Sequence, residues 1–141
     1  MATAPLDLLI FNPPSEEFPY VPVGTFALCD WLNRQGQRVR VVNLGQVSRS
    51  EAHAQIDRAM ESSAPRNVGI ILNWKETLSG FLAVGDKVHR TWPGLPVWTG
   101  GLTAGFYAEE LLLRAGFLHG VVRGDSEIPV QAICSREELS A

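Results

Sequence analysis

The residues that could carry out nucleophilic, acid–base or metal chemistry are few in this chain of 141 residues, and they lie far apart. The two cysteines, Cys29 and Cys134, form neither a Cys-x-x-Cys pair nor any other metal-ligand spacing. The three histidines, His53, His89 and His119, are expected on two helices and just before a strand, at solvated or core-edge positions. A hydrolase would need a Gly-x-Ser-x-Gly nucleophile elbow, which is lacking. These residues therefore indicate neither a hydrolytic centre nor a metal site.

The loop 12–24 follows the first predicted strand and is rich in proline and acidic residues. Nucleotide-binding α/β domains have a Gly-rich turn there, whose backbone N–H groups bind phosphate. Pro13 and Pro14 lack that N–H group, and Glu16 and Glu17 repel phosphate, which also argues against a flavodoxin-type flavin protein. The prolines restrict the unfolded chain, so ordering this loop costs less entropy than usual. We interpret it as a loop shaped around a bulky, flat ligand, with a purely structural connection as the alternative.

Apolar runs alternate with amphipathic segments along the chain, which predicts a doubly wound α/β domain, Rossmann-like (flavodoxin-like), over residues 1–141. Its five parallel strands would have helices on both faces and the order 2-1-3-4-5. We expect strands at residues 6–11, 38–43, 68–72, 95–99 and 117–122. Apolar helix stripes run over residues 24–32, 52–60, 78–88 and 104–115, and a last helix follows residue 126.

Several residues have the spacing of helix caps. Gly36 is placed to end the first helix, and Ser48 with Glu51 forms a capping box before the second. Asn73 and Glu76 have the same spacing of a cap and its return partner.

The formal net charge is -3, and the chain has no run of Lys or Arg, which argues against nucleic acid or acidic membrane surfaces as partners. Neither a signal peptide nor an apolar run of bilayer length is evident, so we expect a cytoplasmic protein with reduced cysteines.

In a doubly wound sheet, ligands bind beyond the carboxyl ends of the strands, which here are predicted at Asn12, Asn73, Gly100 and Gly124. A response-regulator receiver would need acidic residues after strand one, Asp after strand three and Lys after strand five. The chain has Asn12, Asn73 and Arg123 there, so phosphoryl transfer is not expected. Taken singly, these loops are also explained as turns and helix caps.

In their order along the chain, the loop motifs resemble the N-terminal cobalamin (B12)-binding domain of B12-dependent radical S-adenosylmethionine (SAM) enzymes. In that family the loops usually contain N-P-P, P-x-G, a Pro followed by G-G, and G-E-G-E. The matching residues are Asn12-Pro13-Pro14, Pro22 with Gly24, Pro93 with Gly100-Gly101, and Gly124-Asp125-Ser126-Glu127. Asp125 and Ser126 replace the usual Glu and Gly. The resemblance covers about residues 6–130.

The resemblance implies that cobalamin binds with its nucleotide tail between the sheet and the helices and its corrin ring over the strand ends. Because the Asp-x-His-x-x-Gly motif of methionine synthase is missing, no His would ligate the cobalt. Thr77, Gly100, Gly101 and Thr103 would line the tail slot, and Trp74 would touch the corrin. The implied cofactor-binding residues are Asn12, Pro13, Pro14, Pro22, Gly24, Asn73, Trp74, Thr77, Gly100, Gly101, Leu102, Thr103, Gly124, Asp125, Ser126 and Glu127.

The catalytic half of such an enzyme is not encoded in these 141 residues. A radical SAM domain holds its 4Fe-4S cluster with three cysteines in a C-x-x-x-C-x-x-C motif, which two distant cysteines cannot supply. By resemblance, this domain would not be catalytic by itself and would serve a radical SAM domain, in cis or in trans, in methyl transfer or a radical rearrangement. The alternative is a degenerate B12-domain fold that acts as a non-catalytic protein- or small-molecule-binding module.

Overall fold

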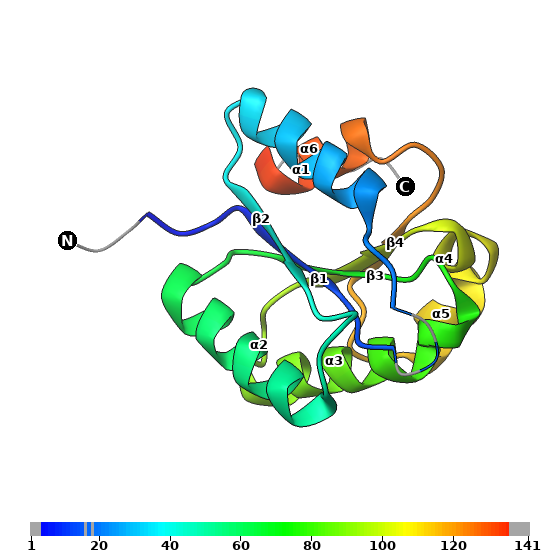
Figure 1. The fold of residues 1–141 in the computed structure, drawn as a ribbon. Helices are drawn as coiled ribbons and strands as arrows, with labels where there is room; N and C mark the ends of the chain where they lie inside the picture. Colours follow the sequence, from blue (N-terminus) through cyan, green and yellow to red (C-terminus); the bar gives the residue numbers. More distant parts are fainter. Residues whose placement is uncertain (1–3, 16, 18, 136–141) are drawn as a thin grey trace.

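The computed structural model describes residues 4–15, 17 and 19–135 and contains one five-stranded sheet in which every pairing is parallel. The strand order is β2-β1-β3-β4-β5, as predicted, and the doubly wound α/β class is confirmed (Figure 1). The strands are β1 (Leu8–Asn12), β2 (Val39–Asn43), β3 (Val68–Ile71), β4 (Val97–Gly100) and β5 (Gly120–Val122).

Helices cover both faces of the sheet (Figure 1). One face carries α1 (Val23–Arg34) and α6 (Glu127–Ser135). The other carries α2 (Arg49–Ser63), α3 (Leu78–Thr91), α4 (Leu102–Phe106) and α5 (Ala108–Arg114), with a short 3-10 turn, η1 (Lys75–Thr77), before α3. Hereafter these are called the α1/α6 face and the α2/α3 face.

The alternation of side chains along each strand divides the core into two clusters. On β1, Leu9 and Phe11 pack with α2 and α3, whereas Leu8 and Ile10 pack with α1 and α6. Because both faces are covered, all five residues of β1 are buried, which explains the nearly continuous apolar run of its sequence.

Two local expectations were wrong. The segment 104–115 is not one helix, because it breaks between α4 and α5 at Tyr107, where φ is -112° and ψ is 27°. The break is invisible in the sequence, since Ala104, Ala108 and Leu111 keep helical spacing across it and all are buried. Asn73 does not cap the helix that follows it, because its side chain accepts instead from the backbone N–H of Leu102, the first residue of α4.

Of the other cap signals, Ser48 caps α2 without the return bond of a full capping box, and Gly36 ends α1 as expected. The Glu51 N–H donates to Ser48 Oγ at 3.3 Å at the start of α2, while the Glu51 carboxylate accepts from Arg58 Nη2. Gly36 follows α1 with φ of +94°, a conformation that favours glycine.

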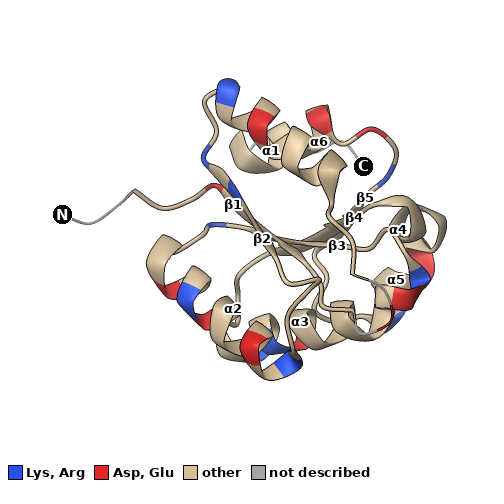
Figure 2. Cartoon of the chain, viewed as in Figure 1, with Lys and Arg blue, Asp and Glu red and all other residues tan. Residues whose placement is uncertain are grey.

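Charged residues are spread over the helices and the connecting segments, and Lys and Arg are interspersed with Asp and Glu (Figure 2). In this view no basic stripe of the kind that follows a nucleic-acid backbone is seen. None of the helices in the described ranges combines the length and apolar character needed to cross a bilayer.

Candidate functional site

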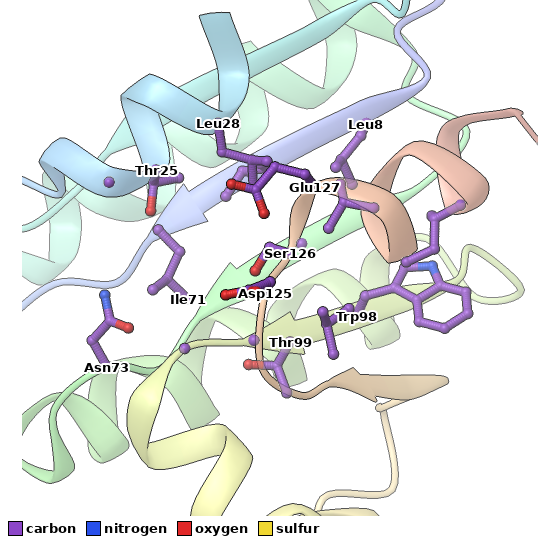
Figure 3. Close-up of a pocket in the computed structure, with 18 of the residues that line it drawn as sticks. Leu8, Thr25, Leu28, Ile71, Asn73, Trp98, Thr99, Asp125, Ser126 and Glu127 are labelled. Atoms are coloured by element: carbon purple, nitrogen blue, oxygen red, sulfur yellow. The ribbon is translucent and has the colours of Figure 1, made fainter. Parts of the chain in front are cut away.

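A cavity of about 600 Å³ lies on the α1/α6 face, between the sheet and these two helices (Figure 3). Its size falls within the roughly 300–1,000 Å³ that is typical of ligand pockets. The lining residues come from four strands, both helices and the loops at the carboxyl ends of the strands. They are Leu8, Ile10, Gly24, Thr25, Ala27, Leu28, Trp31, Gly69, Ile70, Ile71, Asn73, Trp98, Thr99, Gly100, Gly101, Val122, Gly124, Asp125, Ser126, Glu127, Val130 and Ile133.

The floor of the cavity consists of rows of residues that the strand register aligns across the sheet. Ile10, Gly69 and Trp98 are register partners and form one row. Two residues nearer the carboxyl ends, Gly100 pairs with both Ile71 and Val122 in the next row. The cavity therefore extends from the strand ends well into the middle of the sheet, rather than lying on its rim.

Three glycines leave the cavity open at positions where the backbone conformation does not require glycine. Gly24, Gly69 and Gly100 do not have positive φ. A Cβ would meet nothing within 4 Å at Gly24, and only ordinary contacts at 3.5 Å or beyond at Gly69 and Gly100. Since glycine in a strand weakens it and often marks the close approach of a ligand, Gly69 and Gly100 are best explained by the space they leave.

The inner end of the cavity is apolar. Figure 3 shows Leu8 and Trp98 at the end opposite to Thr25 and Asn73. The Trp98 ring lies over Gly120, where a Cβ would come within 2.5 Å of it, and its Nε1–H donates to Asn67 Oδ1 at 3.1 Å. The only polar atom of this indole is therefore already bonded away from the cavity.

Apart from Thr99 on β4, the polar side chains of the cavity belong to its mouth, at the carboxyl edge of the sheet. They come from the first turn of α1, from the loop after β3 and from the loop before α6, where Gly124 has φ of +73°. The charged ones, Asp125 and Glu127, are both acidic, and none of the lining residues is Lys, Arg or His. The mouth thus favours hydrogen-bond donors and repels anions.

The loops after β3 and β4 are tied to each other beside the mouth. Asn73 accepts the Leu102 N–H through Oδ1 at 3.1 Å and the Thr103 hydroxyl through its carbonyl at 2.7 Å. Gly101 has φ of +117°, and a Cβ there would lie 2.4 Å from Asn73 Oδ1. The two adjacent glycines therefore differ in role, because Gly101 permits the turn and Gly100 opens the cavity.

The proline-rich loop after β1 is held by a buried amide network. Asn12 has no exposed surface; its Nδ2 donates to Asn43 Oδ1 at 2.8 Å, and its Oδ1 accepts from the Tyr20 hydroxyl at 2.7 Å. Burial raises the pKa of the Tyr20 phenol, and a hydrogen bond from Asn73 opposes that rise. The Tyr20 ring meets Trp74 edge-on, with centroids 6.5 Å apart. Glu16 of this loop lies outside the described residues.

Eight of the sixteen predicted site residues line the cavity: Gly24, Asn73, Gly100, Gly101, Gly124, Asp125, Ser126 and Glu127. The other eight, Asn12, Pro13, Pro14, Pro22, Trp74, Thr77, Leu102 and Thr103, do not. Thr77 is fully buried and donates to the Trp74 carbonyl, while Thr103 lines a separate groove between α3 and α5. The cavity therefore does not include the two threonines that the resemblance assigns to a nucleotide-tail slot.

Sequence reasoning missed the inner half of the cavity. Leu8, Ile10 and Trp98 were expected only within strands, and Ile133 only within the last helix. One signal was present, since Gly69 interrupts an apolar strand, and an isolated glycine in a strand often marks a close approach.

No metal centre is formed in the described part of the chain, where no three His, Cys, Asp or Glu side chains come together. His53, His89 and His119 are all absent from the cavity lining. Both cysteines are free thiols; Cys134 is buried in the core behind the cavity, and burial raises its pKa to about 11. Comparison with protein-family models, curated proteins and solved structures found no match for this chain.

Proposed function

We propose that this domain binds cobalamin, with the nucleotide tail in the cavity of the α1/α6 face and the corrin ring over the carboxyl ends of the strands. One observation carries the proposal. The cavity reaches from the strand ends to mid-sheet because Gly24, Gly69 and Gly100 have no side chain there. Neither the backbone conformation nor the packing of neighbouring groups requires glycine at these three positions.

The residues present fit the aromatic base and the peripheral amides of such a ligand. The apolar inner end, lined by Leu8, Ile10 and Val130, suits a flat aromatic base. At the mouth, Asp125 and Glu127 are able to accept hydrogen bonds from the amide side chains of a corrin. Because no His lines the cavity, the proposed cobalamin receives no imidazole from the described residues.

When bound, cobalamin would supply methyl-group or radical chemistry, and the part of this chain is to hold and orient it. The reaction itself then requires a radical SAM domain that carries S-adenosylmethionine and a 4Fe-4S cluster, in cis or in trans. This division of labour rests on the resemblance of the loop motifs.

Reconstitution tests the proposal directly. The purified chain is incubated with hydroxocobalamin and separated by gel filtration, and the visible spectrum of the protein fraction is recorded. We expect co-elution and a spectrum altered from that of free hydroxocobalamin. Failure of the cofactor to co-elute at concentrations of about 100 μM, which corresponds to weak binding on the usual affinity scale, would overturn the proposal.

A matched pair of variants shows where the cofactor binds. Gly69→Leu places a side chain in the middle of the cavity floor and should weaken binding by at least about tenfold. Gly105→Leu makes the same change in α4, outside the cavity lining, where a Cβ meets nothing within 4 Å, and should leave binding unchanged. Circular dichroism confirms that both variants remain folded. Equal effects of the two changes would argue that the cavity is not the binding site.

The alternative, a non-catalytic binding module, is favoured by apolar side chains exposed on α4 and α5. Leu102, Phe106 and Leu113 are 63%, 78% and 85% exposed, and exposed apolar patches often mark protein contacts. This alternative predicts no spectral change with hydroxocobalamin, so the same reconstitution separates the two functions.

A further inference from the structure

The inner end of the cavity has almost no polar group that is free to bond a ligand. Its lining there is Leu8, Ile10, Leu28, Val130 and Ile133, with the rings of two tryptophans. The backbone groups of the floor belong to parallel strands paired on both sides. The acidic, hydroxyl and amide side chains of the lining come from the mouth, except for Thr99, whose side chain lies on the opposite face of the sheet.

Three lining side chains near the inner end do carry a polar atom, and none of them accepts a hydrogen bond from the inner cavity. Thr99 alternates with Trp98 and Gly100 along β4, so its side chain lies on the opposite face of the sheet, where it is buried and donates to the Ile70 carbonyl at 2.6 Å. The Trp98 Nε1–H is used by Asn67 Oδ1. Trp31 is half-buried on α1, and its indole offers only a donor, so it cannot accept from an amine.

A ring with its own N–H donors would lose its hydrogen bonds to water on entering this end and would find no acceptor in exchange. A buried donor without a partner is costly, whereas an apolar ring of similar shape gains from burial. The inner cavity therefore discriminates between flat rings by their polarity as well as by their size.

Resting on the proposed function, we infer that this domain selects corrinoids whose lower base is an apolar benzimidazole over those whose lower base is a purine. Adenine carries an exocyclic amine and additional ring nitrogens, while dimethylbenzimidazole presents two methyl groups at the same edge. The selectivity resides in the α1/α6 face and not in contacts with the corrin ring, which is the same in both ligands.

The test compares the affinities of three corrinoids for the purified chain. Each corrinoid is titrated with the protein, and binding is followed in the visible spectrum. The three corrinoids are cobalamin, its analogue with an adenine lower base, and cobinamide, which lacks the nucleotide base. We expect cobalamin to bind about ten- to a hundredfold more tightly than the adenine analogue, the range that one or two unpaired buried donors imply. Cobinamide should also bind at least about tenfold more weakly than cobalamin, because nothing then fills the cavity.

The outcomes separate this inference from the proposed function. If the adenine analogue or cobinamide binds as tightly as cobalamin, the inference is overturned while cobalamin binding stands. If none of the three binds, the proposed function is overturned and the inference with it.

A pair of isosteric variants supplies a second measurement. Val130→Thr puts a hydroxyl acceptor at the inner end of the cavity and should reduce the preference for cobalamin over the adenine analogue several-fold. Val39→Thr makes the same change on the same face but outside the lining, and should keep the preference of the parent. An unchanged preference in a folded Val130→Thr variant would contradict the inference.

Discussion

On the α2/α3 face of the sheet, neighbouring groups occupy the space beside the buried glycines of α3. A Cβ at Gly80 would lie 2.1 Å from the Pro14 carbonyl oxygen, and one at Gly85 would lie 2.2 Å from the Phe117 ring. On the α1/α6 face, Gly24, Gly69 and Gly100 have no such neighbour. The same residue type thus permits close packing on one face and keeps a cavity open on the other.

This difference indicates that the cavity is not a consequence of a small chain or a poor core. The same strands pack fully on their other face, where Leu9, Phe11 and Val68 have no exposed surface. Protein interiors are normally close-packed, and an unfilled space forgoes burial and dispersion energy. The space is kept open by glycines at positions where a larger residue would fit, and a ligand is the best explanation for it.

The largest expected difference between the faces comes from two adjacent leucines of β1. Leu9→Ala removes a side chain from the packed face and should lower the free energy of unfolding by about 4–5 kcal/mol. Leu8→Ala removes the same atoms beside the existing cavity and should cost only about 2–3 kcal/mol, because fewer contacts are lost. Urea unfolding of both variants measures the two values. Equal costs would mean that the two faces are packed alike.

Alanine at one glycine of each face should have opposite effects on stability. Gly85→Ala forces a methyl group against the Phe117 ring and should destabilise the fold by about 1–3 kcal/mol, despite the better helix propensity of alanine. Gly69→Ala meets only ordinary contacts in a strand and should stabilise by a few tenths of a kcal/mol up to about 1 kcal/mol. Thermal and urea unfolding report both signs. A loss of stability in Gly69→Ala would break the comparison.

The smallest expected effect on stability concerns the exclusion of water from the core of the α1/α6 face, behind the cavity. Burial raises the pKa of the Cys134 thiol to about 11, above its ordinary value, so the folded state holds this proton more tightly than the unfolded state does. The resulting stability is present below the unfolded pKa and is lost as pH rises toward the folded pKa. Between about pH 8 and about pH 10 we expect a loss of about 1 kcal/mol from this group.

Variants of the two cysteines show whether this loss of stability at high pH comes from the Cys134 thiol. Cys134→Ala should remove this part of the pH dependence of the unfolding free energy, whereas Cys29→Ala should retain it. If Cys134→Ala shows the same pH dependence as the parent, water reaches the thiol and the rear of this face is not dry.

The class of fold was predictable because it depends on local patterns, whereas the strand order cannot be read from the sequence and was only favoured by the number of repeats. Alternating apolar runs predict buried parallel strands, and the number of β–α repeats favours one common order. The break at Tyr107 was not predictable, since the apolar spacing of Ala104, Ala108 and Leu111 is the same in one helix as in two. The bond from Asn73 to Leu102 was missed for a related reason, because its partner is distant in sequence.

The candidate site was predictable at its mouth and not at its inner end. Loop residues such as Asn73, Gly100 and Asp125 follow predicted strands, so the position of the strand ends places them together. Which apolar side chains border a cavity depends on how far α1 and α6 stand from the sheet, and apolar periodicity carries no information on that distance. Leu8 and Leu9 are both buried and equally apolar, yet only Leu8 borders the cavity.

The amino-acid sequence by itself determined the order of strands and helices, the absence of a phosphate-binding turn after β1 and the separation of the cysteines and histidines, because these are matters of residue type and spacing. The tertiary structure alone decided that the space lies on the α1/α6 face, that Thr77 and Thr103 do not line it, and that none of the described side chains offers a free acceptor at its inner end. The physical reason is that a cavity forms where segments distant in sequence meet without side chains large enough to fill the space between them. Such a space is a property of packing and not of any one segment.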